Sequence, residues 1–417
     1  MRKQLRLASI VAGMAIIASA CSSPSTSSAP SAAPSTSAEP GASGSAAPAA
    51  LSGEITLWHS YGSGGGETGA LNSALGKVHD ANPELKIAVV EQPFDQIFTK
   101  WRTDVAAGGG ADMFIAPNDS LGQDAREESL MNLDEFLNGN PALEGYLPVA
   151  IEGSKVDGSF YMVPESLKAV ALWYDKSKVA TPPATSDELL AAVKDGSVKI
   201  GINQGVYHQF GWSGAFGGSL MDDSGKCTAD QGGFADAFAY LKELKDAGAT
   251  FNTDGNALKT AFQTGEINAI IDGPWQTADF RTALGDNLAV APIPAGPSGK
   301  ANPFTGTDGW YINPNLDADQ AQLAVNVALA LTSPESMQIF VDDAGHVPAN
   351  PAVTVSDPIT KGFATAAADG LPRPQSAQFN NWWGPFGDAL NKVIDTGADP
   401  ATAVKDACAL MNEASGL

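Results

Sequence analysis

Tryptophan and tyrosine side chains are the residues of this sequence best suited to hold a small ligand. Flat aromatic faces pack well against the apolar C–H side of a sugar ring, while nearby polar groups bind its hydroxyls. The candidates lie mostly near the ends of predicted elements: Trp58, Tyr61, Tyr207, Trp212, Trp275, Trp310, Trp382 and Trp383. For any one of these rings, burial in a core is the alternative. Adjacent residues of one helix cannot face the same core, so Trp382 or Trp383 should be exposed or line a cleft.

Motifs for catalysis, phosphate binding or metal binding are weak in this chain. The glycine-rich stretch 62–69 lacks the Lys that a phosphate loop has before its Thr, here Thr68. Around Ser213, Ala215 stands where the G-x-S-x-G motif of a nucleophile elbow requires its last Gly. Neither H-E-x-x-H nor C-x-x-C occurs. We therefore expect no enzyme, no metal and no cofactor. A secreted carbohydrate-active enzyme stays open as an alternative, because its paired acids need not be neighbours in sequence.

The charge balance limits the class of ligand. The chain has 24 basic and 47 acidic residues, a formal net charge of −23. This field disfavours nucleic acid, anionic ligands and anionic membrane surfaces. A neutral ligand is expected, with a cationic solute such as a polyamine or a basic peptide as the alternative.

The amino terminus predicts export. A basic start with Arg2 and Lys3 precedes an apolar stretch over residues 7–20, which predicts a signal peptide. Small residues then lead to Cys21 in a pattern that resembles the lipobox of bacterial lipoproteins, which implies acylation of Cys21. Residues 22–50 are almost entirely Ser, Pro, Thr, Ala and Gly, so residues 21–50 should form a lipidated, disordered linker.

The two other cysteines are Cys227 and Cys408. In an oxidising compartment they could form one disulfide, which we favour over two free buried thiols. The spacing alone decides neither.

Strands and helices alternate from residue 54 onward, which predicts an α/β protein with parallel sheets covered on both faces. The predicted strands are 54–58, 86–90, 112–116, 169–174, 199–202, 267–271 and 288–291. The predicted helices are 67–79, 94–105, 234–246, 258–264, 318–331, 334–342, 383–395 and 400–411. The length suits two α/β lobes, with a ligand at the carboxyl ends of their strands.

Several local patterns resemble the sugar-binding proteins of bacterial ABC importers, in particular the maltose/maltodextrin-binding proteins. The most specific is Phe262 to Trp275, a helix and short strand that end in Gly-Pro-Trp. Shorter matches lie in residues 107–114, 163–176, 291–296 and 345–348. The resemblance covers the chain from Ile55 to Met411.

The resemblance implies a two-lobed periplasmic-binding-protein-like fold, with a ligand cleft between the lobes and a hinge that the chain crosses three times. The crossings are expected near Glu165–Lys168, Val290–Pro292 and Ser333–Met337. Lobe 1 would comprise residues 51–166 and 291–335, and lobe 2 residues 167–290 and 336–417.

The resemblance also implies roles for particular residues. Trp275, Tyr207 and Trp383 would contact sugar rings, Asp119 would accept hydrogen bonds from hydroxyls, and Trp58 and Tyr61 would line the cleft. The predicted ligand-binding set is Trp58, Tyr61, Asp119, Lys168, Tyr207, Trp275, Trp310 and Trp383. Departures from the family pattern, among them Lys168 in place of the frequent Glu, leave the sugar open between malto-oligosaccharide, trehalose and another glucoside or oligosaccharide.

The expected function is capture of an oligosaccharide and its delivery to the permease of an ABC importer. The protein should be monomeric and extracytoplasmic, held at the membrane by its lipid anchor alone.

Overall fold

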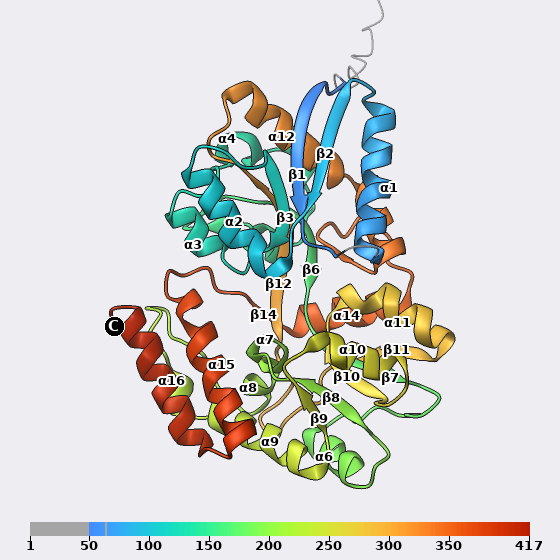
Figure 1. Cartoon of the computed structure of the whole chain (residues 1–417), viewed down its shortest axis with the longest axis vertical. Coiled ribbons are helices and arrows are strands. Elements are labelled where there is room, and N and C mark those ends of the chain that lie inside the picture. Colours follow the sequence, from blue (N-terminus) through green and yellow to red (C-terminus); the bar gives the residue numbers. More distant parts are fainter. Residues whose placement is uncertain (1–49, 63–64) are drawn as a thin grey trace, which may run out of the picture. The chain divides into compact units, whose positions relative to one another are not determined.

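Two β-sheets organise the part of the chain that the structure, a computed structural model, describes: residues 50–62 and 65–417. The predicted signal peptide, Cys21 and most of the predicted linker therefore lie outside the described residues. The larger sheet has the strand order β13 (Val347–Pro348), β6 (Val163–Lys168), β12 (Phe304–Ile312), β3 (Met113–Pro117), β1 (Gly53–His59) and β2 (Leu85–Glu91), and β14 (Leu371–Pro372) pairs with β12. The smaller sheet has the order β11 (Leu288–Ala291), β7 (Ala171–Asp175), β10 (Ala269–Asp272), β8 (Ile200–Asn203) and β9 (Thr250–Asn252). Figure 1 shows the two sheets one above the other, with β6 and β12 leading from one toward the other.

The prediction of parallel sheets was wrong in part, because both sheets are mixed. In the larger sheet β1 is parallel to β2 and β3, but β12 is antiparallel to β3 and β6. In the smaller sheet β10 is parallel to β8 and antiparallel to β7. The physical reason is the connection between sheets. The chain reaches β12 from β11 of the smaller sheet, so β12 begins at the edge of the larger sheet where β3 and β6 end. It therefore runs antiparallel to both of these strands.

Helices cover both sheets. Those whose chain segments precede or follow strands of the larger sheet are α1 (Gly66–Ala81), α2 (Phe94–Ala106), α3 (Leu121–Arg126), α4 (Asp134–Leu137), α5 (Pro148–Glu152), α12 (Ala318–Leu331) and α13 (Pro334–Ile339), the last continued by a π-helical turn, Phe340–Ala344. Those near the smaller sheet are α6 (Ser186–Lys194), α7 (Val206–Gln209), α8 (Gly211–Ala215), α9 (Phe234–Ala247), α10 (Gly255–Gln263), α11 (Thr277–Leu284), α15 (Trp383–Asn391) and α16 (Pro400–Ala414). A short hairpin of β4 (Lys155–Val156) and β5 (Ser159–Phe160) completes the strands. None of the helices in the described ranges is long and apolar enough to span a membrane.

The chain changes sheet at identifiable points. Strand β6 ends at Lys168 in the larger sheet, and β7 begins at Ala171 in the smaller one. The second change lies between β11 and β12, at residues 292–303. Residues 334–348 stay with the larger sheet, because α13 and its π-helical turn contact α1 and β13 pairs with β6. We therefore place the third change after Pro348, later than the expected 333–337. The residue ranges of the lobes remain a prediction.

Helix α14 (Pro358–Asp369) lies where the sheets meet. It contacts β6, β12 and β13 of the larger sheet as well as β7 and β11 of the smaller. The ring of its Phe363, which is fully buried, lies 4.8 Å from the ring of Trp173 on β7. The apolar core is consequently continuous across the region through which the chain passes between sheets.

Candidate ligand-binding site

The candidate site lies where the carboxyl ends of strands from both sheets carry polar and aromatic residues. In the larger sheet, β3 is followed directly by Asn118 and Asp119, and β6 ends in Lys168. In the smaller sheet, Tyr207 follows β8 and Trp275 follows β10. Edges of this kind are where open α/β sheets bind ligands, because the side chains after several strands converge there.

Lys168 is the centre of a buried ion cluster. Its ammonium lies 2.5 Å from Oε1 of Glu67 and 2.9 Å from Oδ2 of Asp308. All three side chains are buried. Burial alone lowers the pKa of Lys168, but the negative charges of Asp308 and Glu67 outweigh it and raise that pKa. Lys168 is therefore a cation held by two carboxylates.

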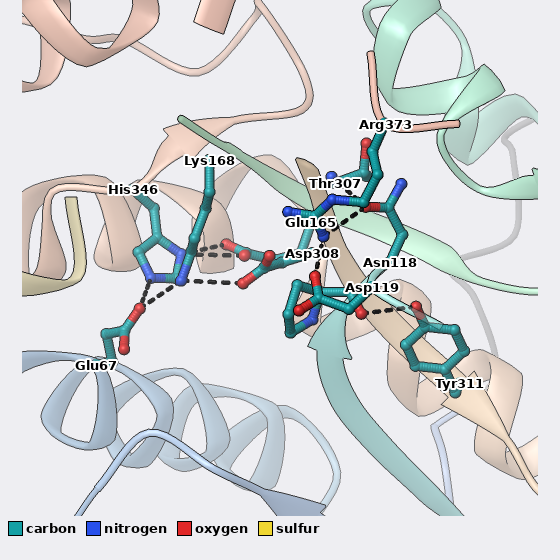
Figure 2. Close-up of polar contacts among 11 residues, drawn as sticks. Glu67, Asn118, Asp119, Glu165, Lys168, Thr307, Asp308, Tyr311, His346 and Arg373 are labelled. Atoms are coloured by element: carbon teal, nitrogen blue, oxygen red, sulfur yellow. Dashed lines mark hydrogen bonds and ion pairs between the residues drawn. The ribbon is translucent and has the colours of Figure 1, made fainter. Parts of the chain in front are cut away.

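His346 extends this cluster across the larger sheet, as Figure 2 shows. Its Nε2 lies 2.9 Å from Oε1 of Glu67, and its Nδ1 lies 3.0 Å from Oε2 of Glu165. An ionised carboxylate only accepts hydrogen bonds, so a ring between two of them is best satisfied when both nitrogens carry protons. Burial lowers the pKa of His346, but the charge of Glu165 and the hydrogen bonds to both carboxylates raise it to about 9.

Arg373 forms a second ion pair at the same edge. Its Nη1 donates to Asp119 and, at 3.3 Å, to Oδ1 of Asn118. Its guanidinium also lies over the ring of Tyr207, 5.4 Å from the ring centroid. Arg373 follows β14 of the larger sheet, whereas Tyr207 follows β8 of the smaller sheet. Their contact therefore joins residues that come from the two sheets. The predicted acceptor Asp119 is thus already paired with a cation.

Tyr207 and Trp275 form the aromatic side of the site. Their ring centroids are 6.2 Å apart with planes inclined by 36°, and both side chains are half-buried. The Trp275 ring lies over Gly273, where an added Cβ would come within 2.0 Å of it. The glycine of Gly-Pro-Trp is therefore needed for the ring to lie against the backbone, and the ring's partial exposure leaves a face for a ligand.

The structure does not bring every predicted site residue to this edge. Trp310 has no exposed surface and lies in the hydrophobic core of the larger sheet. Trp58 is buried against the ring of Trp101, with their centroids 6.0 Å apart. Both rings are held by core packing, so we leave them out of the proposed site. The Tyr61 ring does lie at the ion cluster, 5.7 Å from the ammonium of Lys168.

The Trp382–Trp383 pair behaves as expected of adjacent residues. Trp382 is 1% exposed, whereas Trp383 is half-buried. Their ring centroids are 4.7 Å apart, and Trp383 also packs 6.2 Å from the ring of Phe304. Trp383 is therefore the member of the pair that has surface available to a ligand.

Cys227 and Cys408 form a disulfide, with Cα atoms 5.4 Å apart. Both residues are buried, and the bridge ties α16 to the loop before α9.

Five ionisable residues of the site were absent from the predicted set: Glu67, Glu165, Asp308, His346 and Arg373. Glu67, Glu165 and His346 lie in stretches with recognisable sequence patterns, but nothing in those patterns marks them as partners. Asp308 had no signal, because no strand was predicted over residues 304–312. Only their contacts in the folded chain bring them together.

The arrangement is suited to binding a polar ligand without net charge. Four carboxylates, from Glu67, Glu165, Asp308 and Asp119, face three cations, from Lys168, His346 and Arg373. The cluster therefore nearly neutralises itself despite the chain's strongly negative total. In the part of the chain that the structure describes, no group of His, Cys, Asp or Glu is arranged to hold a metal ion.

Known proteins resemble this chain along most of its length. The Bacillus subtilis galactooligosaccharide-binding protein is 26% identical over 391 residues, 88% of this chain and 90% of that protein. A maltooligosaccharide ABC transporter solute-binding lipoprotein of Streptococcus pneumoniae is 26% identical over 345 residues, 75% of this chain and 78% of the relative. The solved structure of the Thermus thermophilus maltotriose binding protein with maltotriose has a TM-score of 0.78 and 26% identity, and the match covers 87% of this chain and all of the other.

The Thermus thermophilus protein and other solved structures that this chain resembles share the two-lobed fold, so the fold class inferred from the resemblance is confirmed. A family model described as bacterial extracellular solute-binding protein matches residues 74–367. A match of this extent assigns a binding role outside the cytoplasm, not an enzymatic one. The chain belongs to the family of bacterial extracellular solute-binding proteins.

Proposed function

We propose that this protein captures a neutral oligosaccharide of the maltodextrin type and delivers it to the permease of an ABC importer. The observation that carries the proposal is that aromatic rings and a cluster of paired charges lie together at the carboxyl ends of the strands. The half-buried rings of Tyr207 and Trp275 lie close to a buried cluster of charges that nearly cancel. Aromatic faces bind the apolar side of a pyranose, and the polar groups bind its hydroxyls.

The named relatives support this ligand class. One binds maltotriose in its solved structure, and another is named for maltooligosaccharide and for an ABC transporter. A galactooligosaccharide-binding relative is equally similar, so a galacto-oligosaccharide is the second candidate. The cationic alternative is disfavoured, because the carboxylates of the site are already paired with Lys168, His346 and Arg373.

The first experiment is a thermal-shift screen of the secreted chain with Cys21→Ser, which cannot be acylated at that position. The panel would contain maltotriose, trehalose, a galacto-oligosaccharide, a polyamine and a basic peptide. A ligand at a hundred times its dissociation constant adds about 2.7 kcal/mol to the free energy of unfolding. Stabilisation by a sugar alone supports the proposal. Stabilisation by the amine or the peptide without any sugar would contradict it.

Trp275→Ala tests where the sugar binds. Loss of stacking and burial should weaken binding of the stabilising sugar by about 1–3 kcal/mol. The matched control is Trp58→Phe, which changes a core tryptophan outside the proposed site and should leave the affinity unchanged. Equal affinity of wild type and Trp275→Ala would remove Trp275 from the site.

We further propose that the protein is a monomer anchored to the membrane through an acylated Cys21, a residue outside the described ranges. The Streptococcus pneumoniae relative that is named a lipoprotein supports this. Labelling of growing cells with a fatty-acid probe should mark the wild-type chain and not Cys21→Ala. Label on both variants, or on neither, contradicts acylation at this position. Light scattering of the Cys21→Ser chain tests the monomer.

A further inference from the structure

Two directly opposed residues in the larger sheet have buried polar atoms without hydrogen-bond partners among the described residues. They are Ser166, whose Oγ is unpartnered, and Asp308, whose Oδ1 is unpartnered. Ser166 is fully buried and Asp308 is 3% exposed. The buried hydroxyl of Tyr61, beside the same cluster, is also unpartnered. Buried polar groups in native proteins nearly always have partners, so such atoms call for one.

The register of the sheet places these atoms together. Ser166 on β6 and Asp308 on β12 are paired residues of neighbouring antiparallel strands. Paired residues have side chains on the same face, and Lys168, two residues beyond Ser166, shares that face. The ammonium of Lys168 indeed lies 2.9 Å from Oδ2 of Asp308.

The hydrogen-bonding capacity of the ion pair is only partly used. An ammonium has three protons, and those of Lys168 reach Glu67 and Asp308, which leaves one. Asp308 accepts from Lys168 through Oδ2, and its Oδ1 is left. One donor and one acceptor therefore remain side by side on the same ion pair.

The strand register places Asp308 near the ion pair that contacts Tyr207. Asp308 is paired with Pro117, two residues before Asp119. Asp119 forms an ion pair with the Arg373 guanidinium that lies over the ring of Tyr207. Burial raises the pKa of the Tyr207 hydroxyl, and the negative charge of Asp308 raises it further, which agrees with this placement. Burial likewise raises the pKa of Asp308 although Lys168 opposes this, as expected of a carboxylate that lacks part of its solvation. A ligand that contacts Tyr207 and Trp275 would have its hydroxyls within reach of Asp308.

We propose that the Lys168–Asp308 ion pair, with the hydroxyl of Ser166, recognises two adjacent hydroxyl groups of the bound sugar. One hydroxyl donates to Oδ1 of Asp308, and its neighbour accepts the remaining proton of Lys168. Ser166 completes the acceptor side. This assignment rests on the proposed function and makes Asp308 and Ser166 specificity-determining residues. A site built to bond a hydroxyl strongly rejects an analogue that lacks it, because its own buried groups are then left unpaired.

The test measures binding of maltotriose and of its monodeoxy derivatives by calorimetry, with the Cys21→Ser chain as the parent. Asp308→Asn should weaken maltotriose binding about tenfold or more, since a charge-assisted bond is replaced by a weaker one. The same substitution should have little further effect on the derivative that lacks the hydroxyl bound by Asp308. Ser166→Ala should show the same pattern to a smaller degree.

The matched control is Asp124→Asn, which changes a buried carboxylate paired with Arg102 outside the site. It should leave maltotriose affinity unchanged. A merely structural role of Asp308 would weaken every derivative by the same factor, and this outcome overturns the proposal. So does unaltered binding by Asp308→Asn, while the proposed function then stands. Failure of the parent chain to bind maltotriose overturns both.

Discussion

Replacement of His346 by Gln should destabilise the protein in a manner that depends on pH. The side chain is fully buried, and contact with Glu165 and Glu67 raises its pKa from 6.5 to about 9. Each unit of pKa shift corresponds to about 1.4 kcal/mol, so the protonated ring contributes on the order of 3 kcal/mol to the free energy of unfolding. Because the folded-state pKa is raised, this contribution is complete below the unfolded pKa. It is lost as the pH rises through the folded pKa of about 9.

The assay is urea unfolding of the Cys21→Ser chain, with and without His346→Gln, at intervals from about pH 6 to pH 10. The two curves of unfolding free energy should be furthest apart near pH 6 and should approach each other above pH 9. His79→Gln, which changes an exposed histidine at the end of α1, is the control and should leave the curve unchanged. A difference between wild type and His346→Gln that stays constant over this range would refute a charged His346.

Three further substitutions test the packing that supports the site. The Cys227–Cys408 disulfide closes a sequence separation of 181 residues, so Cys227→Ser with Cys408→Ser should lower the free energy of unfolding by about 5 kcal/mol in chemical denaturation. Unchanged unfolding of the reduced chain would contradict this. Trp310→Ala should cost about 3–5 kcal/mol of stability but leave the sugar affinity of the folded protein intact, since Trp310 lies in the core; a selective loss of affinity would return it to the site. Thr185→Ala removes the capping box of α6 and should lower the melting temperature through a loss of about 1 kcal/mol, which Thr185→Ser should largely avoid.

Much of the fold could be predicted from local patterns. The helices predicted over 94–105 and 318–331 correspond to α2 and α12, and the strand predicted over 288–291 is β11. These segments have clear periodicity and distinct ends. The helix predicted over 383–395 is divided into α15 and a π-helical turn, Lys392–Thr396, which periodicity does not reveal.

Strand β12 could not be predicted, although all nine of its residues are buried. Its sequence, Phe304 to Ile312, contains two glycines and an aspartate, which are depleted in strands. The neighbours explain the difference. Strands β3 and β6 flank it on both sides, so the pairing of its backbone outweighs the weak intrinsic preference of its residues.

The candidate site likewise has one part that the sequence predicted and one part that it did not. Its aromatic half, Tyr207 and Trp275, was predicted from the resemblance to sugar-binding proteins, in which Gly-Pro-Trp is a local motif that the sequence itself displays. Its ionic half depends on contacts between residues far apart in the chain: Lys168 and Glu67 are separated by 101 positions, and His346 and Glu67 by 279. No local spacing carries such pairings, since each requires the complete larger sheet.

The ionic half also explains why a strongly acidic chain can hold a neutral ligand. The net charge is a sum over the whole chain, whereas the charges of the proposed site are mostly buried and are paired with one another. Three cations, Lys168, His346 and Arg373, are paired with the four carboxylates of the site, which leaves it one negative charge from neutrality. The charges at this edge therefore largely cancel, and individual hydrogen-bond donors and acceptors remain. Hydrogen bonds to hydroxyl groups use such atoms, and that is the chemistry by which a sugar is distinguished from an amine.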